Sequence, residues 1–129
     1  LEDIISGSGI SKIYETLTHE KLSAEDIFEK FLDKEPDALF VINGFIKSLS
    51  QTLSDLALSF LPGKGILLAG SLSRSIYTHF NEQNFFKPFI NNNTGMHFDI
   101  LKNTPIGVIT KERTPLYGNL SFYKNLNKI

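Results

Sequence analysis

Apolar residues recur every three or four positions in three successive stretches of the chain, a spacing that places them on one face of a helix. The first stretch follows the glycine-serine segment 7–9, which is typical of a loop, and the second follows Ser23, with Asp26 three positions on as a weak capping box. The third begins at Pro36 and ends before Pro62, because proline suits the first turn of a helix and cannot continue one. Three helices are predicted, with these apolar faces: Ile10, Ile13, Tyr14 and Leu17; Ile27, Phe28, Phe31 and Leu32; Leu39, Phe40, Ile42, Phe45, Ile46, Leu49, Leu53, Leu56, Ala57 and Phe60.

The second half of the chain adds strands to this helical pattern. The run "GILLAGS" at 65–71 is apolar without interruption between glycines, which is typical of a strand buried on both faces of a parallel sheet. We expect strands at 66–69 and 106–110 to be adjacent and parallel, with a helix connecting them. The remaining predictions are a helix around 76–80 with 81–89 as its end or a second turn, a loop at 91–95, an extended segment at 97–101 and a closing helix over 116–126. The predicted class is therefore α/β and helix-rich.

Composition narrows the range of functions. The chain has 129 residues, 41% of them hydrophobic, which suits a single domain over 1–129. Its formal net charge is −1 and its 13 basic residues form no stripe, so no nucleic-acid partner is expected. We expect no membrane segment and a cytoplasmic location, because no apolar run approaches ~20 residues and the first residues do not resemble a signal peptide. There is no cysteine, and the three histidines lack metal-binding spacing, so no metal site is predicted.

Two glycine-serine segments stand where helices are expected to begin. Segment 6–9 and segment 70–71 would each present backbone N–H groups and the positive end of a helix dipole to an anion. Segment 70–71 also follows a strand, and ligands of α/β folds bind beyond the carboxyl ends of strands. Taken singly, each is explained as well by glycine in a turn and serine as a helix cap. His97 and Asp99 would share one face of a strand, but without a nucleophile beside them a structural role is favoured.

Together and in order, these segments resemble the C-terminal part of the bacterial glucokinase family, within the sugar kinase, hexokinase and actin superfamily. The stretch "LEDIISGSGISKIY" is similar to its Glu-x-x-x-Ser-Gly-x-Gly-Leu segment, and "LPGKGILLAGSLSRSI" to its glycine turn, strand and adenosine segment. "TPIGVITKERTPLYGNLSFY" is similar to its last strand and the loop that follows. The resemblance implies the helix-rich C-terminal part of a ribonuclease H-like ATPase lobe with a small, incomplete, largely parallel sheet. It also implies a fragment, whose missing upstream lobe carries the catalytic base and the main phosphate loop.

The resemblance assigns roles to particular residues. Glu2 matches a carboxylate that binds sugar hydroxyls, although a solvated acid near a chain end is an equal alternative. The nucleotide-binding positions are Ser6, Gly7, Ser8, Gly70 and Ser71. No catalytic residue falls in this chain. The implied substrates are glucose and ATP with Mg²⁺, and the implied partners are the upstream lobe and, through surface that this lobe would cover, a second copy in a homodimer.

Two hypotheses compete for the function. The first is the C-terminal part of an ATP-dependent glucokinase that phosphorylates the 6-hydroxyl of glucose and belongs to glycolysis. The second is a non-catalytic helical interaction or regulatory domain derived from such a kinase. Departures from the family pattern favour the second slightly, since Ser71 stands where glycine is common and the segment 112–115 replaces Asp-Asn-Pro-Gly. Ser73 and Arg74 could add nucleotide contacts, but a capping and a solvated role are expected for them.

Overall fold

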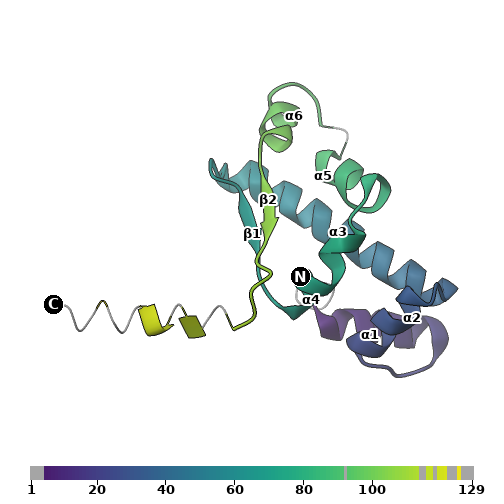
Figure 1. The fold of residues 1–129 in the computed structure, drawn as a ribbon. Helices are drawn as coiled ribbons and strands as arrows, with labels where there is room; N and C mark the ends of the chain where they lie inside the picture. The colour runs from purple at the N-terminus through teal and green to yellow at the C-terminus, as the bar shows by residue number, and fades with distance from the viewer. Residues whose placement is uncertain (1–4, 92, 114–115, 118, 122–124, 126–129) are drawn as a thin grey trace.

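The computed structural model describes residues 5–91, 93–113, 116, 117, 119–121 and 125. Within them, helices pack on one side of a small two-stranded sheet (Figure 1). The predicted helix-rich α/β class is confirmed at this level. The elements follow in this order: α1 (Gly7–Thr18), α2 (Ala24–Leu32), α3 (Pro36–Phe60), β1 (Ile66–Leu68), α4 (Ser71–Ile76), η1 (Tyr77–His79), η2 (Glu82–Phe86), α5 (Lys87–Ile90), α6 (Gly95–Lys102) and β2 (Ile106–Val108).

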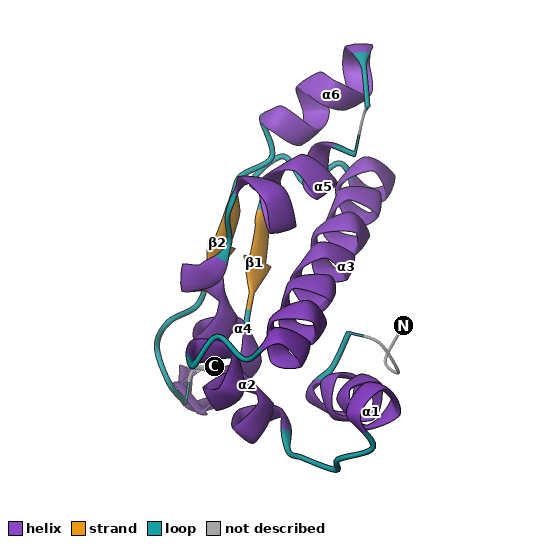
Figure 2. Cartoon of the chain, turned by 90° about the vertical axis from the view of Figure 1, so that its right-hand side faces the viewer, coloured by secondary structure: helices purple, strands orange, loops and turns teal. Residues whose placement is uncertain are grey.

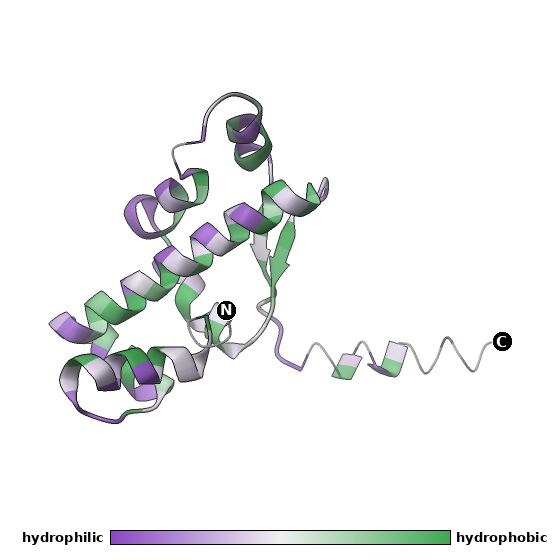
Figure 3. Ribbon diagram, turned by 180° about the vertical axis from the view of Figure 1, so that it is seen from behind, coloured by the Kyte–Doolittle hydropathy of each residue, from purple (hydrophilic) through white to green (hydrophobic). Residues whose placement is uncertain are grey.

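The long helix α3 is the centre of the packing. It contacts α1 and α2 at one end, and η2, α5 and α6 toward the other (Figure 2). Apolar residues recur every three or four positions along this helix, with polar residues between them, as an amphipathic helix requires (Figure 3). Its buried face carries much of the core, as the sequence pattern predicted: Ala38, Val41, Ile42, Phe45, Ile46, Leu53 and Ala57.

The ends of the first three helices follow from local chemistry. The capping box predicted at the start of α2 is confirmed, with Ser23 and Asp26 each bonded to the other's backbone N–H. The segment 7–9, predicted as a loop, is instead the first turn of α1, because the Ser6 side chain accepts a hydrogen bond from the Gly9 N–H and caps the helix there. Lys30 of α2 joins the end of α1 by donating to Glu20 at 2.8 Å, and this hydrogen bond raises the pKa of Lys30.

The two strands pair in parallel, as predicted, with Ile66 opposite Ile106 and Leu68 opposite Val108. Glycine is required beside this pairing, because a Cβ on Gly65 would lie 2.3 Å from the Pro105 carbonyl oxygen. The prediction of a strand buried on both faces was wrong. Leu67, the central residue of β1, is 72% exposed, whereas its neighbours Ile66 and Leu68 pack against the core, so the described helices cover only one face of this strand.

The connection between the strands is helical, and it differs from the sequence prediction in one place. Of the two alternatives predicted for 81–89, the second turn is observed, because Asn81, with its extended backbone, starts a new helical segment by a capping box with Asn84. The segment 97–101, predicted as extended, belongs to helix α6, because its Leu101 is buried where α6 packs on α3 and α5. Two positions apart on a helix lie on different faces, so His97 and Asp99 do not form a pair.

Two predictions concern other parts of the chain. The closing helix falls partly on residues 118, 122–124 and 126, which lie outside the described residues, so it stays a prediction. Among the described residues, no helix combines the length and the apolar character needed to cross a membrane.

Candidate functional site

The carboxyl ends of β1 and β2 lie at the same edge of the sheet because the strands are parallel. The segment after β1 is Ala69-Gly70 followed by α4, and the segment after β2 runs from Ile109 to Arg113. Ligands of α/β folds gather at such an edge. The sequence-predicted residues Gly70 and Ser71 therefore occupy the expected place in the sheet.

The backbone at Gly70 suits close approach by a ligand. Its φ of 121° and ψ of 164° belong to a region that essentially only glycine adopts. No atom lies within 4 Å of the position that a Cβ would occupy, so the space beside this residue is open. Ser71 begins α4, and no side chain caps this helix.

Ser71 lines three adjoining hollows, and one of them joins the two predicted glycine-serine segments. In a hollow of about 480 Å³, Ser71 shares the lining with Gly7 of α1, and with Phe28 and Leu32 of α2. In a second, of about 270 Å³, Ser71 and Gly70 share it with Ile5, the residue before the cap of α1. Segments more than sixty positions apart in the sequence thus meet at the carboxyl end of β1.

Two other predicted site residues, Ser6 and Ser8, do not line these hollows in the part of the chain that the structure describes. Ser6 caps α1, and its Oγ lies 2.9 Å from the Oγ of Ser8, so both hydroxyls sit at the start of that helix. Glu2 lies outside the described residues, so its role stays a prediction.

The third hollow, of about 300 Å³, adds three basic residues, of which the sequence analysis singled out only Arg74. Arg74 of α4 lines it together with Lys111 and Arg113, which follow β2. Arg74 had been expected to be solvated, and it is half-buried. A signal for Arg113 was present in the sequence, because segment 112–115 departs from the pattern of the resembled family.

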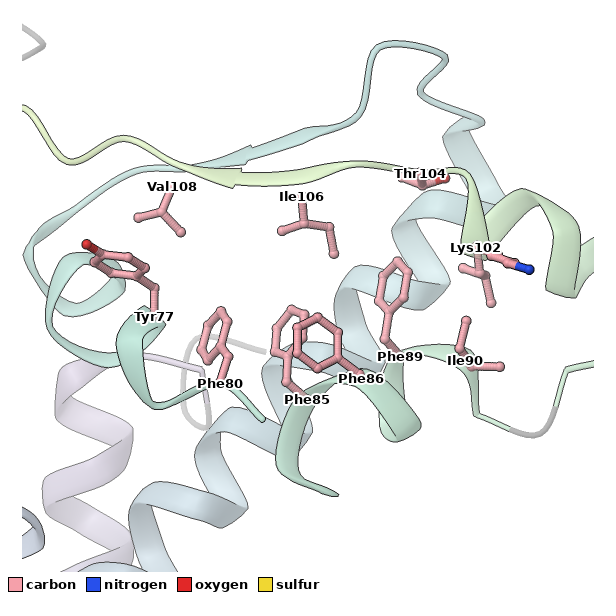
Figure 4. A pocket seen from close by; sticks show the side chains of 11 residues that line it. Tyr77, Phe80, Phe85, Phe86, Phe89, Ile90, Lys102, Thr104, Ile106 and Val108 are labelled. Atoms are coloured by element: carbon pink, nitrogen blue, oxygen red, sulfur yellow. The ribbon is translucent and has the colours of Figure 1, made fainter. Parts of the chain in front are cut away.

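A separate apolar pocket of about 520 Å³ lies between β2 and the segments that follow α4 (Figure 4). Ile106 and Val108 project into it from β2, opposite the rings of Phe80, Phe85 and Phe86. The rings of Phe80 and Phe85 are stacked with centroids 4.1 Å apart. Phe85 belongs to the buried core and Phe80 packs against it, so these rings serve packing.

The described residues contain no group of three or more His, Cys, Asp or Glu side chains that could hold an ion together.

The chain is similar in sequence to known proteins. The model of a family described as glucokinase matches residues 1–126. A protein named glucokinase from Mesorhizobium japonicum is 25% identical over 131 aligned positions, which cover 96% of this chain and 38% of that protein. A glucokinase from Saccharophagus degradans is 28% identical over 135 positions, covering 97% of this chain and 40% of that protein. The chain thus spans about two fifths of the length of these relatives.

Proposed function

The chain belongs to the glucokinase family, as the C-terminal part of a bacterial glucokinase, and from this premise we propose that it serves an ATP-dependent kinase that phosphorylates the 6-hydroxyl of glucose. In this proposal the chain supplies one sugar-binding carboxylate and part of the nucleotide cleft, within a ribonuclease H-like lobe. The catalytic base and the main phosphate loop belong to the upstream part of the protein. ATP brings Mg²⁺ with it, held by groups outside the described residues.

One observation carries the proposal: the convergence of Gly7 and Ser71 on one hollow at the carboxyl end of β1. In the proposed cleft, Gly70 and Ser71 face the adenosine portion of ATP, and Ser6, Gly7 and Ser8 line the nucleotide side. Glycine at 70 lets the ligand approach the backbone, because a side chain there would have to project into open space that the nucleotide needs. Glu2, four residues before the cap of α1, accepts hydrogen bonds from glucose hydroxyls.

These residues position substrates, and they do not perform the proton transfer. Holding the donor and the sugar in one geometry removes much of the entropic barrier to phosphoryl transfer. A base that takes the proton of the 6-hydroxyl is also required, and it lies upstream in this proposal. We therefore expect the 129-residue chain alone to give no measurable turnover, while the protein that also contains the upstream part is active.

A coupled assay with glucose, ATP and Mg²⁺ tests the function in that longer protein. Glu2→Ala should raise the KM for glucose about tenfold or more, the order expected for loss of one charge-assisted hydrogen bond. Glu15→Ala, which removes an exposed carboxylate from α1, should leave the KM unchanged. Absence of ATP-dependent glucose phosphorylation would exclude the kinase. An active enzyme with the same KM after Glu2→Ala would exclude only the role of Glu2.

The alternative is a non-catalytic interaction or regulatory domain. The exposed apolar residues favour it, since Phe60 and Leu67 are 76% and 72% exposed and could meet a protein partner. The same assay separates the two functions, because a regulatory domain joined to its upstream part would bind a partner without phosphorylating glucose.

A further inference from the structure

The hollow beside Gly70 brings together basic residues from two separate segments. Arg74 comes from α4, and Lys111 and Arg113 come from the segment that follows β2. They are 37 or more positions apart in the sequence and meet only because β1 and β2 are parallel neighbours. The hollow measures about 300 Å³, large enough for a phosphate group and its nearest neighbours.

The charge of this hollow contrasts with that of the chain. Acidic residues slightly outnumber basic ones overall, 14 to 13, yet none of the described residues lining the hollow is acidic. Glu112 lies between two of the cations in the sequence but is not among those lining residues. Like charges gathered in one concave site repel one another, and an anion between them relieves that repulsion.

The chemistry of the lining matches a phosphate. An arginine guanidinium can donate two parallel hydrogen bonds to phosphate oxygens, and a lysine ammonium adds a point charge. The Lys111 ammonium lies 4.1 Å from the centroid of the Tyr117 ring, a cation–π contact that limits where this charge can sit. Gly70 and Ser71, which face adenosine in the proposed cleft, border the same hollow, so a phosphate held by the three cations lies beside the adenosine position.

We propose that Arg74, Lys111 and Arg113 form a phosphate-binding site that makes donor affinity depend on the donor's negative charge. The site recognises the phosphate chain of a donor, either a nucleoside triphosphate or inorganic polyphosphate. It favours donors that carry more negative charge. That the bound phosphate belongs to a phosphoryl donor rests on the proposed function. The binding of phosphate by the three cations does not, because it follows from the charge and geometry of the hollow.

Calorimetric titration with inorganic tripolyphosphate tests the site in the longer protein that contains this chain. We expect saturable binding that weakens about tenfold in each of Arg74→Gln, Lys111→Gln and Arg113→Gln, the order expected for one charge-assisted hydrogen bond. Lys64→Gln is the matched control, because it removes an exposed cation from the turn before β1, at the other end of the strand. Affinity for uncharged adenosine should stay within about twofold in all four variants.

The outcomes separate this inference from the proposed function. Tripolyphosphate binding that depends on the three cations, in a protein that does not phosphorylate glucose, would support the site and exclude the kinase. Unchanged binding in all three variants, or no binding by the unaltered protein, would overturn the site even if glucose is phosphorylated. Competition between ATP and tripolyphosphate then tells whether one site takes both donors. Because Lys111 and Arg113 are exposed, their variants keep the test valid if Arg74→Gln fails to fold.

Discussion

Gly70 and Gly44 differ in whether their backbone conformation requires glycine. In both, a Cβ would meet no atom within 4 Å, so packing forbids a side chain at neither position. Gly44 lies inside α3 with ordinary helical geometry, whereas Gly70 has a φ of 121° that L-residues rarely adopt. The backbone alone therefore decides what a methyl group costs at each place.

This difference predicts opposite effects of the same substitution. Gly70→Ala should lower the free energy of unfolding by about 1–3 kcal/mol, the cost of a residue held in a sparsely populated backbone region. Gly44→Ala should raise it by about 0.5–1 kcal/mol, because alanine is the better helix former. Urea denaturation followed by circular dichroism measures both. Equal shifts in the two variants would mean that the conformation at Gly70 is not the one described.

At the scale of the element, the start of α1 tests whether Ser6 serves the fold, the ligand or both. Ser6→Ala removes the acceptor of the Gly9 N–H and should cost about 1 kcal/mol of stability. Ser6→Asp keeps an acceptor and adds a charge that favours a helix N-terminus, so stability should be retained. If this segment faces the donor, however, the added carboxylate repels its phosphates and ATP affinity falls.

Ser23→Asp is the matched control, since Ser23 caps α2 in the same way. The Ser23 Oγ–H also donates to the Asp26 carboxylate at 2.7 Å, so Ser23→Asp should lower stability through repulsion between two carboxylates while leaving ATP affinity unchanged. Calorimetry with ATP and thermal unfolding of the longer protein give the two readouts. If Ser6→Asp binds ATP as well as Ser23→Asp does, Ser6 is a cap alone.

Elements with strong local signals were predictable from the sequence, and those set by packing were not. Helix α3 was predicted because Pro36 and a long amphipathic stretch specify it without reference to the rest of the chain. Helix α6 was predicted as extended because five residues with alternating apolar positions fit both structures, and burial of Leu101 decided between them. In the site, Gly70 carried a local signal, but the approach of Arg74 to Arg113 depends on the pairing of the strands.

At the scale of the whole molecule, the described chain has more apolar surface than its own elements cover. Phe60 and Leu61 at the end of α3 are 76% and 60% exposed, and Leu67 of β1 is 72% exposed. The two-stranded sheet also presents unpaired edges among the described residues. In the longer relatives, about three fifths of the sequence lies outside the region that this chain matches. We propose that this remaining part covers these surfaces in the longer protein.

We therefore expect the isolated 129-residue chain to self-associate. Its weight-average mass in sedimentation equilibrium should rise with concentration above that of the 14.5 kDa monomer. Leu67→Thr introduces a β-branched residue, which favours strands, while removing exposed apolar surface, so it should weaken association without unfolding the sheet. Leu17→Thr on α1, where Leu17 is 48% exposed, is the control for apolar surface away from the sheet. A monomer at every concentration would contradict the prediction, and equal effects of the two variants would move the contact away from β1.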